Sequence, residues 1–202
     1  MSTVAAGPVM LYTEQTPNPE TIKFVVNRML YKGTADFRTR ELADEWSPLA
    51  AALFDHAYVK GVYICNNYVS ITKEFNYNWP DIMLVLKEFL KQYIADDKPI
   101  LRKGFEEAVQ AQEAEKIEAE YSGEDAELVK KIKELIDTYV KPAVEMDGGN
   151  IEFRSFNKGV VSVVLQGSCS GCPSSTITLK SGIEGMLKRM VPEVTEVVAE
   201  MG

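Results

Sequence analysis

The sequence contains few of the side chains that usually bind metals or form disulfides. Its 202 residues include three cysteines, Cys65, Cys169 and Cys172, and one histidine, His56. An odd number of cysteines in a chain without an export signal argues against a disulfide framework. We therefore expect the chemistry of the chain, or a metal, at the one close pair of cysteines, Cys169 and Cys172.

Long apolar runs and an excess of basic residues are also missing. Apolar runs such as Ile82–Leu86 are far shorter than the roughly 20 residues of a membrane-spanning helix. Acidic residues outnumber basic ones by 30 to 22, and no basic face emerges that could bind a phosphate backbone. Neither a membrane nor a nucleic acid is therefore expected as a partner.

The N-terminal segment has no basic residue before Lys23. Secretory signals begin with a positively charged region, and transit peptides are rich in arginine. This segment resembles neither, so the sequence predicts a soluble, cytoplasmic protein.

A polar stretch divides the apolar pattern of the chain into two parts. We expect an N-terminal domain at residues 10–98, a solvated and partly helical linker at residues 99–123, and a C-terminal domain at residues 124–202. Strand and helix patterns are mixed in both domains. The predicted fold class is therefore α+β, with each small β-sheet packed against helices.

The N-terminal domain is expected to contain three strands and two helices. Alternating and β-branched residues indicate a strand at Thr21–Val26. Pro48 and Pro80 mark the first turns of a short and a longer helix, because proline is favoured at that position. Asn66 and Asn67 separate two further strands, since asparagine tolerates the positive φ of a tight hairpin.

The C-terminal domain has the expected order α-β-β-α-β. Apolar residues recur at helical spacing from Leu128 to Val140, after which Pro142 breaks or restarts the helix. Two strands follow around a turn at residues 157–159, and Pro173 starts another helix before a closing strand. This pattern suits two helices packed on one face of a small sheet.

Cys169 and Cys172 lie in the loop between a predicted strand and the helix that starts at Pro173. Their i, i+3 spacing lets both sulfur atoms point the same way. The exposed N–H groups at the start of a helix favour negative charge. Both thiols are therefore expected to ionise more easily than a free cysteine.

Three functions compete for this cysteine pair. It could be a thiol-disulfide oxidoreductase site, which also uses C-x-x-C at the start of a helix. It could be half of a structural zinc site, but such a site needs four ligands, and the C-terminal domain has no other Cys and no His. It could also be one half of a shared site, in which two chains each contribute two thiolates to a 4Fe-4S cluster.

The C-terminal domain resembles the NifU-like (Nfu-type) iron-sulfur cluster carriers. The resemblance covers roughly residues 124–200 and rests on the segments MDGGNIEF and GVVSVVLQGSCSGCPSST. The N-terminal domain is similar to the Nfu-type N-terminal domain through TPNPETIKF, SPLAAALF and VSITK. The order of the two domains is that of the family.

This resemblance implies a non-catalytic carrier that binds a labile 4Fe-4S cluster in a homodimer. The cluster and metal ligands that it implies are Cys169 and Cys172, with no catalytic residues. Apo iron-sulfur proteins would accept the cluster, and an upstream scaffold would donate it. The alternative function is a thiol-disulfide oxidoreductase.

Three other features have simpler interpretations. His56 lies on a short apolar helix and is interpreted as a packed or capping imidazole. Cys65 alternates with apolar residues in a strand and is interpreted as a small buried hydrophobe. The segment Asp147-Gly148-Gly149 either shapes a cluster pocket or is only a turn that admits a strand.

Overall fold

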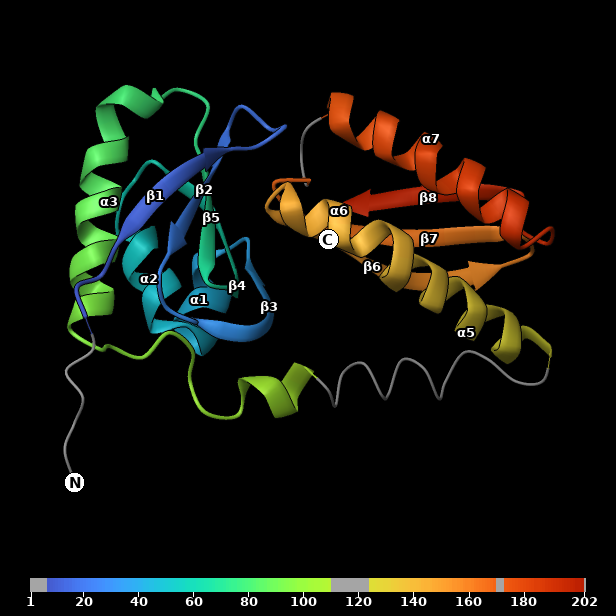
Figure 1. Cartoon of the computed structure of the whole chain (residues 1–202), viewed down its shortest axis with the longest axis horizontal. Helices are drawn as coiled ribbons and strands as arrows, with labels where there is room; N and C mark the ends of the chain where they lie inside the picture. The colour runs from blue at the N-terminus through green and yellow to red at the C-terminus, as the bar shows by residue number, and fades with distance from the viewer. Residues whose placement is uncertain (1–6, 110–123, 170–172, 202) are drawn as a thin grey trace. The chain divides into compact units, whose positions relative to one another are not determined.

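The structure is a computed structural model that describes residues 7–109, 124–169 and 173–201 (Figure 1). Backbone contacts divide the chain into two compact units, whose main boundary lies between Arg102 and Lys103. That boundary lies inside the segment predicted to be a linker, most of which is outside the described residues. In each described unit a β-sheet packs against helices, which confirms the α+β class.

The N-terminal unit is built on a five-stranded antiparallel sheet. Its strand order is β1-β2-β5-β4-β3. The strands in that order are Leu11–Gln15, Thr21–Val26, Tyr68–Lys73, Val59–Asn66 and Tyr31–Phe37. The predicted hairpin between β4 and β5 is confirmed, and Asn66 has the expected positive φ of 47°.

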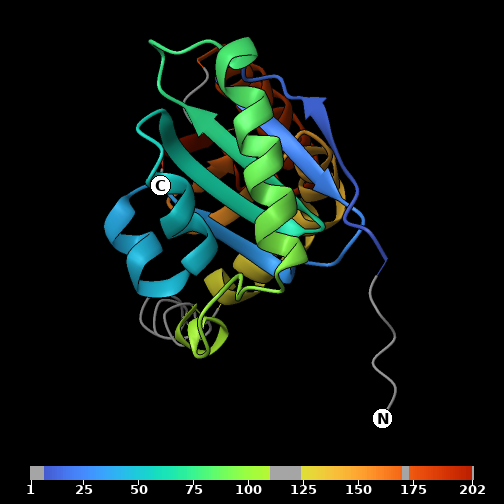
Figure 2. The same ribbon diagram turned by 90° about the vertical axis from the view of Figure 1, so that its left-hand side faces the viewer.

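Three helices accompany this sheet: α1 (Arg40–Trp46), α2 (Pro48–Phe54) and α3 (Trp79–Ala95). Figure 2 shows α3 crossing one face of the sheet. The predicted helix starts are confirmed, since Pro48 and Pro80 both lie in first turns. Fully buried apolar side chains fill the unit, among them Phe24, Phe37, Leu49, Leu53, Leu86 and Leu90.

The sequence did not predict β1, β3 or α1. Strands β1 and β3 are the two edges of the sheet, so much of their surface stays accessible and the alternation of apolar residues is weak. Helix α1 buries only Ala43 and is otherwise mostly polar. In elements with so little buried surface, apolar residues do not recur at the regular spacing that predicts a strand or a helix.

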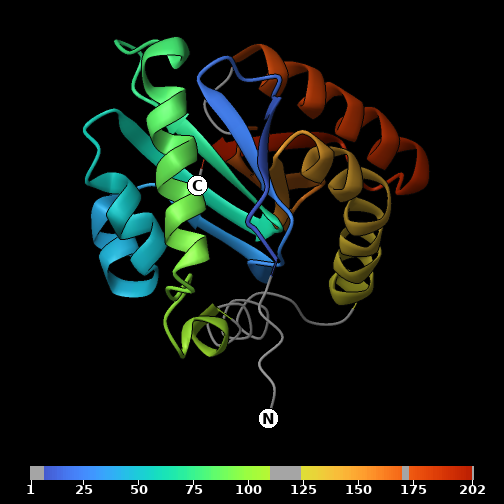
Figure 3. The ribbon, with the colours of Figure 1, turned by 60° about the vertical axis from the view of Figure 1, so that its left-hand side comes forward.

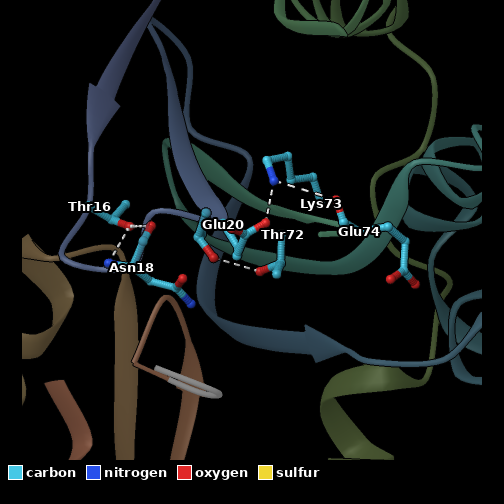
Figure 4. A network of polar contacts seen from close by, with 7 residues as sticks. Thr16, Asn18, Glu20, Thr72, Lys73 and Glu74 are labelled. Atoms are coloured by element: carbon cyan, nitrogen blue, oxygen red, sulfur yellow. Dashed lines mark hydrogen bonds and ion pairs between the residues drawn. The ribbon is translucent and has the colours of Figure 1, made fainter. Parts of the chain in front are cut away.

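The turn between β1 and β2 is held by its own side chains (Figure 4). The Thr16 hydroxyl donates to the carbonyl of Asn18 (2.9 Å) and accepts from its N–H (3.2 Å). Beyond the turn, the buried ammonium of Lys73 pairs with the Glu20 carboxylate. Such local hydrogen bonds are typical of a fixed turn, and the ion pair joins the entry of β2 to the end of β5.

The C-terminal unit has a three-stranded sheet in the order β6-β7-β8. Strand β6 (Gly149–Asn157) is antiparallel to β7 (Val160–Gly167), and β8 (Glu196–Met201) is parallel to β7. Helices α5 (Glu124–Leu135) and α7 (Pro173–Met190) lie along one side of the sheet (Figure 3). Their buried apolar residues share one core with the strands. This agrees with the predicted packing of two helices on one face of a small sheet.

A helix restart at Pro142 and a tight turn after β6 connect the elements of this unit. Pro142 restarts the helix as predicted: a π-helical segment η1 (Ile136–Val140) precedes α6 (Lys141–Met146). Proline has no N–H and cannot continue the α-helical ladder, but it is tolerated in the first turn of a new helix, where Pro142 lies. Between β6 and β7, Lys158 and Gly159 both have positive φ (48° and 86°), as a tight hairpin requires.

None of the helices in the described ranges is both long and apolar enough to cross a lipid bilayer.

Candidate functional site

The structure places Cys169 two residues after β7, in the connection that leads to α7. This confirms the strand-loop-helix context predicted for the cysteine pair. Cys172 lies in residues 170–172, outside the described residues. Their common direction and their role as ligands stay predictions.

The Cys169 side chain packs at the edge of the C-terminal core. It is 6% exposed and belongs to the same buried cluster as Val144, Ile151 and Leu165. The hydroxyl of Ser168 lies 3.9 Å from its sulfur. The Cys169 thiol is therefore mostly covered by the C-terminal core.

The segment Asp147-Gly148-Gly149 is hydrogen-bonded to the cysteine loop. The buried hydroxyl of Ser168 donates to the carbonyl of Asp147 at 2.6 Å. The backbone N–H of Ser168 donates to the carbonyl of Gly148 at 3.3 Å. Gly148 has a φ of 82°, which glycine adopts without steric cost. These two bonds form what we call the Ser168 clasp, which joins the loop to the start of β6.

Gly149 lies directly against Cys169. A Cβ atom at Gly149 would be 2.9 Å from the Cys169 sulfur and 2.6 Å from the carbonyl oxygen of Gln166. Real Cβ atoms essentially never approach other atoms so closely. A glycine is therefore required at position 149 because the cysteine loop comes so close. At position 148 a glycine is favoured because the backbone φ of the turn is positive.

The glycine segment is therefore a turn that also lies against Cys169. Its role in shaping a cluster pocket stays a prediction. The sequence offers Ser168 as one of several serine hydrogen-bond donors around the cysteine pair, but it does not give the partner of this hydroxyl, because serine is common in loops and carries no pattern of its own. The only signal was that Asp147-Gly148-Gly149 and the cysteine loop lie at adjoining ends of two strands predicted to pair.

His56 and Cys65 lie in the N-terminal unit and have structural roles. His56 stacks on Tyr58 with ring centroids 5.2 Å apart, and its Nδ1 is 3.0 Å from the Tyr58 hydroxyl. Cys65 is buried in β4 beside Tyr63 and Tyr68. The interpretations as a packed imidazole and a small buried hydrophobe are confirmed.

Among the side chains that the structure describes, no group of three or more His, Cys, Asp or Glu residues is arranged to hold a metal ion. The candidate site consists of Cys169, the Ser168 clasp and Gly149, together with the predicted second ligand Cys172.

Comparison with known proteins assigns both units to one family. The C-terminal unit matches the NifU-like domain over residues 132–198, and the N-terminal unit matches the domain described as "Scaffold protein Nfu/NifU N terminal" over residues 11–97. The chain is 37% identical over 203 residues to the Drosophila persimilis protein "NFU1 iron-sulfur cluster scaffold homolog, mitochondrial". That alignment covers 98% of the chain and 67% of the relative. The chain belongs to the NifU-like (Nfu-type) family.

A second relative of this Nfu-type chain is the protein of the same name from Drosophila grimshawi, which is 39% identical over 193 residues. That alignment covers 93% of the chain and 60% of the relative. The Nfu-type chain thus spans about three fifths to two thirds of the length of these two relatives.

One solved structure that matches part of the chain is the solution NMR structure of a NifU-like protein from Saccharomyces cerevisiae. It is 20% identical to the Nfu-type chain, with a TM-score of 0.44. The match covers 51% of this chain and 92% of the yeast chain.

Proposed function

We propose that this protein is a non-catalytic carrier that binds a labile 4Fe-4S cluster between two copies of the chain and transfers it to apo-proteins. The observation that carries the proposal is the ligand count. The C-terminal unit contains two cysteines, Cys169 and Cys172, and no histidine. A 4Fe-4S cluster is held by four thiolates, so two copies related by a two-fold axis supply the full set.

The surroundings of Cys169 support its proposed role as a ligand. The neighbouring Ser168 is bonded to the glycine segment by the clasp, and Gly149 lies directly against Cys169, so the backbone that carries this thiol is anchored on two sides. Pre-organised ligands lower the cost of binding because fewer conformations are lost. The relatives are named "iron-sulfur cluster scaffold homolog", which agrees with an iron-sulfur cluster as the proposed cargo.

Transfer would proceed by ligand exchange. A thiolate of the acceptor attacks an iron atom, one iron-sulfur bond forms, and the bond to Cys169 or Cys172 breaks. The departing cysteine leaves as a thiolate, and no atom changes its oxidation state. Because each copy holds only half of the ligands, the dimer separates once the cluster has left.

The acceptors in this proposal are apo iron-sulfur proteins, and the donor is an upstream scaffold. Neither a nucleic acid nor a membrane has a part in it. The cytoplasmic location predicted from the sequence is also a proposal, and both fly relatives are named mitochondrial. Cell fractionation tests it, and recovery of the protein in an organelle would contradict it.

Anaerobic reconstitution with ferrous iron and sulfide tests the proposed function. We expect about two irons per chain and conversion to a dimer. In Cys172→Ala, cluster retention should be lost while the unfolding transition is unchanged, and full iron loading of that variant would contradict the ligand assignment. A zinc module would take up no iron, and an oxidoreductase would need only a reversible disulfide between the two cysteines.

A further inference from the structure

The turn that the Ser168 clasp holds contains the one Asp-Gly pair of the sequence, Asp147-Gly148, and the sequence has no Asn-Gly pair. An aspartyl bond before glycine is the most prone to rearrangement, because glycine has no side chain to hinder attack of its nitrogen on the neighbouring carboxyl group. Asp147 is exposed, so water has access to this side chain. The proposed ligand exchange makes no use of its carboxylate.

We propose that Asp147 is a site of spontaneous isomerisation to isoaspartate, and that the Ser168 clasp suppresses this reaction while it is closed. In the first step the Gly148 nitrogen attacks the side-chain carboxyl carbon of Asp147. The new C–N bond closes a succinimide ring, and one water molecule leaves. In the second step one water molecule adds back and breaks either of the two ring C–N bonds, which gives aspartate or isoaspartate. No oxidant or reductant takes part.

The closed turn keeps the two reacting atoms apart. Asp147 has a ψ of 0°, so the Gly148 nitrogen eclipses the Asp147 nitrogen and is turned away from the Cβ atom that carries the carboxyl group. Ring closure therefore needs a large rotation about the Cα–C bond of Asp147. The Gly148 nitrogen also donates its N–H to the carbonyl of Glu145 at 3.0 Å, and the rotation breaks this hydrogen bond.

The Ser168 clasp opposes the same rotation. The carbonyl of Asp147 accepts from the Ser168 hydroxyl at 2.6 Å, and the carbonyl of Gly148 accepts from the Ser168 N–H at 3.3 Å. Rotation about the Cα–C bond of Asp147 swings its carbonyl away from the hydroxyl. Isomerisation therefore requires the clasp to open, and its rate follows the population of the open turn.

Isoaspartate at position 147 keeps the clasp open permanently. The backbone then runs through Cβ and the former side-chain carbonyl, so it is one carbon atom longer. The carbonyl that accepted from Ser168 becomes part of a side-chain carboxylate. Gly149, which lies against Cys169 at the start of β6, is displaced along with the turn. A chain that has isomerised therefore loses the arrangement of its candidate site.

Incubation of the full apo chain at neutral pH, well below its unfolding temperature, tests the proposal. Isoaspartate is measured over time by peptide mapping with mass spectrometry. The samples are the wild type, Ser168→Ala, the wild type unfolded in guanidinium chloride, and Ser181→Ala as a control at an exposed serine of α7. A second measurement needs no variant: sub-denaturing urea should accelerate isomerisation and hydrogen exchange of the Gly148 N–H together.

Isoaspartate should form at Asp147 about tenfold faster in Ser168→Ala than in the folded wild type, because the loss of one hydrogen bond shifts the opening equilibrium by about that factor. The unfolded chain should react fastest, and the control should stay within about twofold of the wild type. Equal rates in the folded and unfolded wild type would overturn the proposal. Equal rates in Ser168→Ala and the wild type, with urea accelerating neither process, would overturn the role of the clasp.

The effect on the candidate site is measured separately. Wild-type chains that contain isoaspartate should unfold at a lower temperature and load less iron than fresh chains. Asp147→Glu keeps the carboxylate but closes a less favourable ring, so after the same incubation it should retain its own initial stability and iron loading. Unchanged stability of the isomerised wild type would overturn the permanent opening of the clasp. Isoaspartate is measured without iron, so failure of this proposal and failure of the carrier function are distinguishable.

Discussion

Replacing Gly149 by alanine tests whether the glycine segment positions Cys169. The added methyl group would meet the carbonyl oxygen of Gln166 at 2.6 Å and the Cys169 sulfur at 2.9 Å. The carbonyl belongs to β7, which pairs on both sides and cannot easily shift. The cysteine loop must therefore move away from β6, which strains the Ser168 clasp.

The expected change in the free energy of unfolding is the sum of two opposing effects. Forcing a methyl group into a filled site costs about 1–3 kcal/mol, whereas replacing glycine by alanine restricts the unfolded chain and returns about 0.4–1 kcal/mol. The net loss is about 1–2 kcal/mol, which lowers the midpoint of a unit of this size by roughly 5–15 °C. Because the displaced group is Cys169, the iron content after reconstitution should fall as well.

Differential scanning calorimetry and an iron assay measure both effects. Gly185→Ala is the matched control, because a Cβ atom there meets nothing within 4 Å and alanine is favoured in a helix by about 1 kcal/mol. The control should unfold at a higher temperature than the wild type and keep its iron. If Gly149→Ala were as stable as the wild type and loaded the same amount of iron, the proposed steric role of Gly149 would be wrong.

Three further substitutions have defined expected outcomes. Ser168→Ala removes the 2.6 Å hydrogen bond to Asp147, so denaturant unfolding should show a loss of about 1–2 kcal/mol, and an unchanged midpoint would rule out a stabilising clasp. Lys158→Gly relieves a backbone φ of 48° and should raise the unfolding temperature, whereas a decrease would show that the lysine side chain stabilises the turn. The hydrogen bond from Lys188 lowers the pKa of Glu184 below its ordinary value of 4.5, so this carboxylate stabilises the fold above that pH and the effect is lost on acidification. Glu184→Gln should therefore lose less stability than the wild type between pH 6 and about pH 3, and parallel pH profiles would contradict this.

The sequence predicted the elements that bury a continuous apolar face. Strand β2 and helices α3 and α7 carry clear periods of two or 3.6 residues, and Pro48 and Gly159 mark a helix start and a turn through backbone preferences. The edge strands β1 and β3 were missed because only one of their neighbours is a strand and their side chains remain partly accessible.

The candidate site could be predicted only in part. The spacing of the two cysteines and the proline after them are local features, and they indicated a ligand loop at a helix start. The contact between Gly149 and Cys169 joins residues that are distant in sequence, so no local pattern contains it. The Ser168 clasp depends in the same way on how the start of β6 meets the end of β7.

Native mass spectrometry of oxygen-free, reconstituted wild-type protein tests whether two chains share one cluster. If they do, the dimer should exceed the mass of two apo chains by one core of four irons and four sulfides. Loss of that core should return the protein to single chains. A single chain that retains an iron-sulfur core, or a protein that takes up no iron and sulfide under any reconstitution condition, would contradict it.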